Sequence, residues 1–212
     1  MLLSGGIDSA TCVQLLRRRH HLRALTFKYH RIAKRELEAA RAIAQVAGIS
    51  EHRFVRLPDL REAEDIRRAS FVGVPPNYIP MRNGIFYALA ASYAEEVGAD
   101  FIVGGHNRDD IKAFADATPA FFDALGRALR VGSPILRKRR TRVLLPLSGK
   151  SKAQVIRLAS SLEVPLGLTW SCHGDGGSHC WECGGCRARM AAFEKAAVVD
   201  PLRDRGDAGK IS

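Results

Sequence analysis

The stretch Ser4-Gly5-Gly6-Ile7-Asp8-Ser9 lies between a short apolar segment, Leu2-Leu3, and a helix that we expect over residues 8–19. Two adjacent glycines let the backbone turn tightly and approach a ligand without a Cβ clash. The helix that follows supplies unpaired N–H groups and the positive end of its dipole, and the two serines add hydroxyl donors. The stretch therefore predicts a phosphate-binding loop at the carboxyl end of a first strand. It is not a Walker A loop, because no Gly-Lys-Ser/Thr ending follows.

Asp8 is unusual in an anion site, because the side chain is itself negative. Two roles fit it: a cap for the helix, or a ligand that holds Mg²⁺ against phosphates. An ordinary glycine-rich turn is the alternative for the whole stretch. The complete Ser-Gly-Gly-x-Asp-Ser pattern after a strand favours phosphate binding.

Beyond this loop, short apolar strands alternate with amphipathic helices. We expect strands over residues 22–27, 53–57, 101–105 and 142–145, and helices over 34–47, 83–97, 119–130 and 152–162. Gly48 and Gly98 stand where helices should end. Alternation of this kind predicts an α/β fold: a Rossmann-like parallel sheet of about five strands, with helices on both faces and right-handed crossovers.

Two stretches break the alternation. Residues 59–81 contain Pro75-Pro76 and Pro80, and we expect a binding loop or lid there. Residues 164–186 are rich in glycine and cysteine and resemble a metal knuckle. We therefore expect a nucleotide-binding α/β domain over residues 1–163, and a zinc-binding segment with a helix over residues 164–212.

Four of the five cysteines follow the spacing C-x7-C-x2-C-x2-C, at Cys172, Cys180, Cys183 and Cys186. Four thiolates from one short segment can surround a tetrahedral Zn²⁺, and a closed site of this kind is structural. An iron–sulfur cluster is the main alternative, because C-x2-C-x2-C also occurs in such proteins. Cys12 is most simply a packed core residue.

The chain carries 33 basic and 22 acidic side chains, a formal net charge of +11. This surplus suits a protein that binds ATP, an acidic substrate or RNA. The densest basic run spans residues 137–142 and contains no aromatic residue for base stacking. No apolar run is long enough to span a membrane, and no signal peptide is expected, so we expect a cytoplasmic protein.

The phosphate loop resembles that of the PP-loop ATP pyrophosphatases, which adenylate a substrate and release pyrophosphate. More of the chain is similar to one family of that class, QueC, the 7-cyano-7-deazaguanine synthases. The resemblance runs to about Phe193 and rests on five segments: SGGIDSATC at 4–12, TFKYH at 26–30 with Glu36, YIPMRN at 78–83, GGHN at 104–107 with Asp110, and Leu145-Pro146-Leu147 with Lys152 and the cysteine-containing segment 169–193.

The resemblance implies an ATP-dependent carbon–nitrogen ligase of queuosine and archaeosine precursor synthesis, which uses Mg²⁺ and carries Zn²⁺. Such an enzyme adenylates 7-carboxy-7-deazaguanine, forms the amide with ammonia, and dehydrates the amide to the nitrile. The implied catalytic residues are Asp8, Arg82, Asp110 and Lys152. The implied ATP-binding residues are Leu3, Ser4, Gly5, Gly6, Ile7, Asp8, Ser9, Thr26, Phe27, Arg82, Asn83, Gly105 and Asn107, and Asp116 would face the deazaguanine or the metal.

Residues 28–31 and 112–118 differ from the sequences common in that family. A second hypothesis therefore keeps the adenylation of a deazaguanine acid or a tRNA base and changes the acceptor. A third is a zinc-containing nucleotide sensor without turnover. For the first hypothesis we expect a homodimer that acts on small molecules and binds neither nucleic acid nor membrane.

Overall fold

Parallel strands form the centre of the structure, a computed structural model that describes residues 1–30, 32–62, 66 and 78–203. β1 (Ala24–Tyr29) pairs with β2 (His52–Leu57), and β3 (Phe101–Val103) pairs with β4 (Arg142–Leu144). Residues 1–3 join the two pairs: Leu25 N donates to Met1 O at 2.9 Å, and Leu2 N donates to Val103 O at 2.9 Å. The order across the sheet is β2, β1, residues 1–3, β3 and β4, so the expected Rossmann-like parallel sheet is confirmed.

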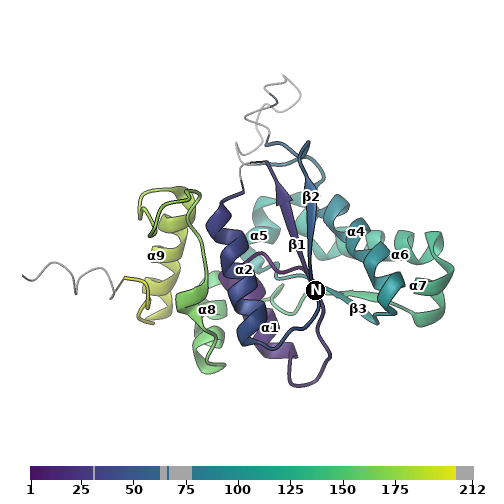
Figure 1. Cartoon of the computed structure of the whole chain (residues 1–212), viewed down its shortest axis with the longest axis horizontal. Coiled ribbons are helices and arrows are strands. Elements are labelled where there is room, and N and C mark those ends of the chain that lie inside the picture. Colours follow the sequence, from purple (N-terminus) through teal and green to yellow (C-terminus); the bar gives the residue numbers. More distant parts are fainter. Residues whose placement is uncertain (31, 63–65, 67–77, 204–212) are drawn as a thin grey trace, which may run out of the picture.

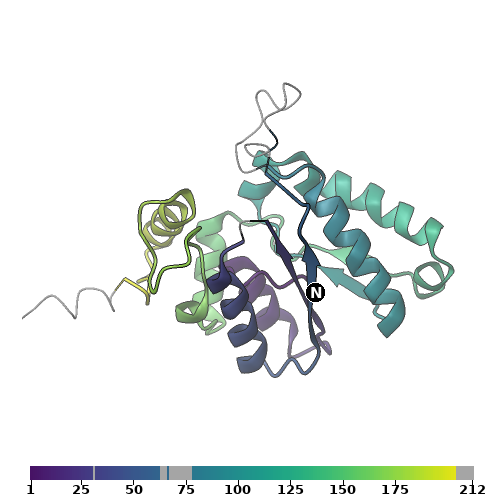
Figure 2. The ribbon, with the colours of Figure 1, turned by 45° about the horizontal axis from the view of Figure 1, so that its top comes forward.

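Helices cover both faces of the sheet (Figures 1 and 2). One group consists of α1 (Ile7–Leu16), α2 (Lys34–Val46), α8 (Lys152–Ser161) and α9 (Gly184–Ala196). The other consists of α4 (Arg82–Val97), α6 (Pro119–Gly132) and α7 (Pro134–Arg139). Each face has its own buried core, the first around Leu3, Ile43, Ile156 and Phe193, and the second around Phe27, Tyr87, Ile102 and Phe122.

The helical spacing predicted the longer helices within a few residues. Gly98 adopts a left-handed φ of 64° at the end of α4, as its position after the apolar stripe indicates. α1 ends at Leu16, three residues before the expected end. Arg17, Arg18 and Arg19 are exposed and give the helix no apolar side chain with which to continue its buried face.

β3 ends at Val103, although the sequence predicts a strand as far as residue 105. The two glycines that follow are in close contact with other elements. A Cβ on Gly104 would lie 1.6 Å from the Tyr87 hydroxyl oxygen, and one on Gly105 would lie 3.1 Å from Ser9 N. Gly104 N still donates to Leu144 O at 3.1 Å, and the absence of side chains at both glycines lets α4 and the start of α1 approach the end of the strand closely.

Two short helices were missed. α5 (Arg108–Ala113) begins at a capping box formed by Asn107 and Asp110, and α7 begins at Ser133 followed by a proline. Both starts carry recognisable signals, but each helix is too short to show an apolar stripe. The described part of the chain also contains two 3-10 turns, at Ala115–Ala117 and Leu166–Leu168.

Most of the expected lid, residues 59–81, lies outside the described residues, which omit 63–65 and 67–77. Within the described part of the chain, every helix is too short or too polar to cross a membrane.

Candidate functional site

The phosphate loop turns directly above the first turn of α2. Gly5 has a φ of 87°, and a Cβ there would lie 2.4 Å from Glu36 O and 2.8 Å from Ala40 N. Ser9 Oγ donates to Gly6 O at 3.0 Å and lies 3.2 Å from Ser4 Oγ. The loop is therefore held by its own serines, and its second position accepts only glycine.

Asp8 does not cap α1. Gly6 is the N-cap residue, and no side chain caps that end of the helix. The Asp8 carboxylate instead accepts hydrogen bonds from Lys152 Nζ and, at 3.3 Å, from Asn107 Nδ2. Of the two roles that the sequence suggests for Asp8, the helix cap is wrong, and the cation-binding role stays a prediction.

A second carboxylate, Asp110, lies close to Asp8. Its Oδ2 accepts from Asn107 N at 3.0 Å, while Asn107 Oδ1 accepts from Asp109 N at 2.8 Å. Burial and the negative charge of Asp8 raise the pKa of Asp110 above its usual value. Asp8 and Asp110 thus bring two carboxylates to the same cavity, and carboxylate oxygens are ligands suited to a cation such as Mg²⁺.

Arg82 and Asn83 begin α4 beside this loop. Asn83 N donates to Asp116 Oδ2 at 3.1 Å, and Asn83 Nδ2 donates to Asp116 O at 3.0 Å. Asp116 therefore holds the start of α4, which carries Arg82 into the site. The sequence suggested that Asp116 faces the deazaguanine or the metal. In the structure its carboxylate instead bonds to the backbone at the start of α4.

A cavity of about 280 Å³ opens between these elements. Nine of the residues expected from the sequence line it: Leu3, Ser4, Asp8, Ser9, Phe27, Arg82, Asn83, Gly105 and Asp110. The other expected residues form the structure around its wall: Gly5, Gly6, Ile7, Thr26, Asn107 and Lys152. Thr26, for example, is buried, and its hydroxyl contacts Leu3 O at 2.5 Å and His52 Nε2 at 2.7 Å.

Sequence reasoning gave no role to several residues that also line the cavity, among them Tyr29, Ile32, Glu36, Phe86, His106 and Phe114. The rings of Phe27 and Phe86 stack with centroids 4.1 Å apart, and Tyr29 is tilted against Phe86 at 5.7 Å. Tyr29 and Glu36 belong to the TFKYH…Glu36 segment that carries the family resemblance, but the sequence did not indicate that they line the cavity. Phe86 shows no signal in the sequence, because it resembles any apolar helix residue.

Burial controls the charges in this cavity. It raises the pKa of Glu36 to about 7, against the opposing effect of the Arg82 guanidinium. It lowers the pKa of His106 to about 4, and the charge of Arg82 acts in the same direction. At neutral pH the imidazole is therefore uncharged, and Arg82 is a cation that faces the phosphate loop.

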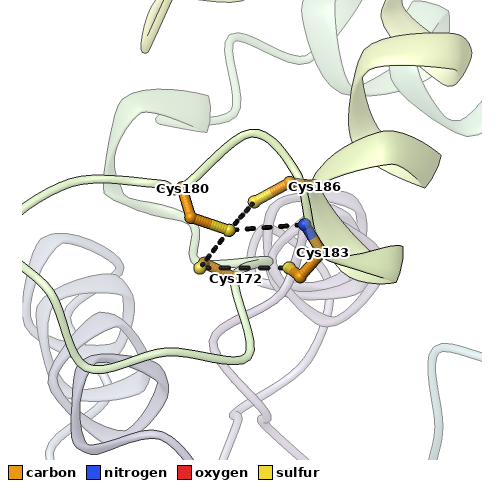
Figure 3. A group of neighbouring side chains, drawn as sticks. All are labelled: Cys172, Cys180, Cys183 and Cys186. Carbon is orange, nitrogen blue, oxygen red and sulfur yellow. Dashed lines mark hydrogen bonds between the residues drawn. The ribbon is translucent and has the colours of Figure 1, made fainter.

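The four cysteines of residues 172–186 converge at the start of α9 (Figure 3). Their sulfur atoms all lie within 4.8 Å of one another, with Cys172–Cys180, Cys180–Cys186 and Cys172–Cys183 separations of 3.5, 3.9 and 4.0 Å. Thiolates about 2.3 Å from one tetrahedral ion lie roughly 3.8 Å apart. The group therefore fits a single metal ion, whereas a four-iron cluster binds each thiolate to a different iron and holds the sulfurs farther apart.

The two histidines of this segment lie outside the group of four sulfurs. His179 is buried against Trp170 and Trp181, and its Nε2 accepts from Ser171 N at 3.1 Å. His173 N donates to Cys183 Sγ at 3.5 Å. The four-cysteine ligand set predicted from the sequence is thus the set that the structure brings together.

α9 is tied to the rest of the molecule by a buried ion pair. The Arg189 guanidinium donates to both carboxylate oxygens of Asp200, at 2.6 and 2.8 Å, and to Thr169 Oγ1 at 2.8 Å. Ahead of the cysteines, Trp170 N donates to Gly5 O at 3.0 Å. The cysteine segment is therefore in direct contact with the phosphate loop.

Comparisons with known proteins point to one family. The family model described as "Queuosine biosynthesis protein QueC" matches residues 1–197. A 7-cyano-7-deazaguanine synthase from a Cyanothece species is 34% identical, over 95% of this chain and 97% of that protein. The synthase of Thermosynechococcus vestitus is 36% identical, over 95% of this chain and 93% of its own length.

The 7-cyano-7-deazaguanine synthase of Thermoplasma volcanium is 32% identical over 96% of this chain and 89% of that protein. Among solved structures, NMN synthetase from Francisella tularensis matches with a TM-score of 0.50 and 19% identity, over 100% of this chain and 77% of that chain. At this identity the likeness concerns the fold alone.

Proposed function

This chain belongs to the QueC family of queuosine biosynthesis proteins, and from that membership we propose that it is a 7-cyano-7-deazaguanine synthase. It converts 7-carboxy-7-deazaguanine and ammonia to the nitrile at the expense of ATP. The observation that carries the proposal is the cavity of about 280 Å³, which brings the phosphate loop, Arg82 and an aromatic wall into one space. A planar acid and a nucleoside triphosphate would bind there side by side.

The chemistry proceeds in three steps. The substrate carboxylate attacks the α-phosphorus of ATP and expels pyrophosphate, which gives the acyl adenylate. Ammonia then attacks the acyl carbon, AMP leaves, and one proton is lost from nitrogen to give the amide. In the third step the amide oxygen is adenylated by a second ATP, and loss of AMP and the remaining two N–H protons gives the nitrile.

The residues of the site suit charge stabilisation rather than covalent catalysis. The N–H groups at the start of α1 and the hydroxyls of Ser4 and Ser9 bind the leaving pyrophosphate. Arg82 pairs with the reacting carboxylate or the α-phosphate, where a planar guanidinium can form two parallel hydrogen bonds. Lys152 offsets the negative charge that develops on the phosphates. Positioning of the acid against the α-phosphate supplies much of the remaining rate enhancement.

We assign Mg²⁺ to the carboxylates of Asp8 and Asp110. The raised pKa of Asp110, caused by burial and by the negative charge of Asp8, supports the assignment, as does the preference of Mg²⁺ for one or two carboxylates together with substrate phosphates. When bound there, Mg²⁺ would neutralise phosphate charge. For Cys172, Cys180, Cys183 and Cys186 we propose a structural Zn²⁺ with no open position, within a zinc-binding segment over residues 164–212 that follows a nucleotide-binding domain over residues 1–163.

We further propose a cytoplasmic homodimer that acts on small molecules and binds no nucleic acid directly. The exposed side chains of Val131 and Ile135, on α6 and α7, support a contact between subunits on that face.

The proposal is tested with purified protein, Mg-ATP, 7-carboxy-7-deazaguanine and ammonium, by following pyrophosphate release and identifying the products by mass spectrometry. The nitrile is the expected product, with two pyrophosphates released per nitrile. Pyrophosphate release with only the amide accumulating would limit the proposal to the first two steps. A zinc-loaded protein that releases no pyrophosphate with this acid would overturn it.

A further inference from the structure

Glu36 projects from the first turn of α2 into the active-site cavity. Its backbone oxygen lies against Gly5 of the phosphate loop. Its side chain shares the cavity with the stacked rings of Phe27 and Phe86 and with Arg82. α2 lies beside β1, the strand that carries Phe27 (Figure 1). The carboxylate is therefore next to a flat aromatic wall and close to the phosphate site.

The surroundings of this carboxylate are unfavourable for a charged group. Burial raises its pKa to about 7, and the attraction of Arg82 only partly offsets that effect. Within the described part of the chain, no hydrogen bond or ion pair ends on the carboxylate. Enclosed polar groups are normally paired inside the protein, so a carboxylate that faces a cavity without such partners points to partners on a ligand.

An ionised carboxylate offers two acceptor oxygens and no donor, and a guanidinium offers only donors. Glu36 and Arg82 together therefore offer a ligand two hydrogen-bond acceptors next to a set of hydrogen-bond donors. A 7-deazaguanine ring has the complementary edge: the N1–H and 2-amino groups donate, and the adjacent 6-carbonyl accepts. Given the activity proposed above, we infer that Glu36 accepts the N1–H and 2-amino hydrogen bonds of the substrate base and that this edge selects a guanine-type acid. Arg82 donates to the 6-carbonyl and, with its other N–H groups, to the reacting carboxylate on the adjacent ring position.

Two other occupants fit less well. The corresponding edge of adenine pairs one donor with a lone-pair acceptor at N1, which would face the second carboxylate oxygen of Glu36. A divalent cation would lie beside the Arg82 guanidinium, whereas Asp8 and Asp110 offer carboxylates on the phosphate side. The specificity role therefore suits Glu36 better than a role in binding ATP or metal.

The test compares two acids, 7-carboxy-7-deazaguanine and 7-carboxy-7-deazahypoxanthine, which lacks only the 2-amino group. Initial rates of pyrophosphate release at saturating Mg-ATP give kcat/KM for each acid with the unmodified protein and with Glu36→Gln. Glu38→Gln is the matched control, because Glu38 lies on the same helix and pairs with Lys34 and Arg35 at the surface. The KM for ATP is measured for all three proteins.

We expect the unmodified protein to favour the 2-amino acid by roughly 10- to 100-fold, the usual effect of a hydrogen bond to a charged group. In Glu36→Gln the amide donor opposes a substrate donor, so kcat/KM for the 2-amino acid should fall by roughly 100-fold and the preference should shrink to a few-fold. The KM for ATP should stay within about twofold, and Glu38→Gln should match the unmodified protein throughout.

The experiment distinguishes failure of the proposed function from failure of the inference about Glu36. No pyrophosphate release with either acid would contradict the proposed function itself. An active unmodified protein that does not discriminate between the acids would overturn the inference without reference to any variant. An undiminished preference in Glu36→Gln, or a raised KM for ATP with an unchanged KM for the acid, would also overturn it, the latter by assigning Glu36 to the nucleotide.

Discussion

At the scale of single residues, the site depends on charged groups that meet from distant parts of the chain. Lys152 opens α8, and its ammonium reaches the Asp8 carboxylate at the start of α1. Lys152 N also donates to Asp109 Oδ2 at 2.9 Å, so the residue is fixed through both backbone and side chain. Its ammonium is thereby held where the triphosphate is expected.

We predict that Lys152→Met lowers kcat/KM for pyrophosphate release by about 100-fold, because one positioned cation is lost from a transition state that develops negative charge. Lys150→Met, two positions earlier in the loop that precedes α8, is the control and should change kcat/KM less than about threefold. The measurement is the initial rate of pyrophosphate release over a range of acid concentrations at saturating Mg-ATP. Equal activity of the two variants would contradict the assignment of Lys152.

Glu36 also affects stability, and the direction follows from its raised pKa. The folded state holds the proton more tightly than the unfolded chain, in which the pKa is near 4.5. Stability therefore falls as the pH rises from about 4.5 through about 7. Glu36→Gln removes this penalty, and we predict a gain of about 1–3 kcal/mol in the free energy of unfolding at pH 8, with little gain at pH 5. Urea unfolding at both pH values measures it, and a gain of equal size at both would show that the raised pKa is not its source.

Contacts of this kind could not be read from the sequence. The motifs identified Asp8, Arg82, Asp110 and Lys152, and three of these four line the cavity, with Lys152 paired to Asp8. The pairing itself depends on how α8 packs against α1, which no local pattern encodes. For the same reason the sequence predicts no role for Glu36, although the residue stands in one of the segments that carry the family resemblance. Its function follows only from its neighbours in space.

At the scale of elements, prediction succeeded where local chemistry decides the outcome. The apolar stripe of residues 34–47 and the glycine after residue 97 define α2 and α4 closely. It was less accurate where another element packs closely: β3 ends at Val103, and the following Gly104 lies against Tyr87 of α4, where a Cβ would be 1.6 Å from the hydroxyl oxygen. α5 and α7 were missed because six residues are too few to show a helical period.

The phosphate loop allows a matched pair of glycine substitutions. Gly5 and Gly48 both have left-handed φ values, 87° and 71°, but only Gly5 meets backbone atoms of another element. Gly48→Ala should cost about 1–2 kcal/mol of stability and leave the activity intact, since strain in the backbone is its main effect. Gly5→Ala adds a clash with Glu36 O and Ala40 N, so we predict loss of ATP binding in addition to a larger loss of stability. Thermal unfolding and ATP titration of both variants measure this, and normal ATP affinity in a folded Gly5→Ala protein would contradict it.

At the scale of the whole molecule, the cysteine segment and the phosphate loop form one structure. Trp170 N donates to Gly5 O at 3.0 Å, two residues before the first cysteine. Thr169, the preceding residue, is buried and bonded to Arg189 of α9, which is in turn paired with Asp200. The four thiolates hold the other side of this segment in place (Figure 3). A metal ion that binds them would therefore stabilise the loop from behind without touching the nucleotide.

This arrangement predicts that removal of the metal weakens ATP binding at a distance. Metal-free protein is prepared with a chelator, freed of the chelator by desalting, and supplied again with Mg²⁺, so that only the thiolate-bound ion is missing. We expect its melting temperature to fall by several degrees and the Kd for ATP to rise at least about fivefold, because the Trp170–Gly5 hydrogen bond no longer rests on an ordered segment.

Addition of one equivalent of Zn²⁺ should restore both values, whereas additional Mg²⁺ should not. By the reciprocity of linked binding, saturating ATP should also reduce the amount of Zn²⁺ lost to the chelator at equilibrium. Metal-free protein that stays folded and binds ATP with unchanged affinity would show that the cysteine segment and the phosphate loop are energetically independent, in spite of the hydrogen bond between them.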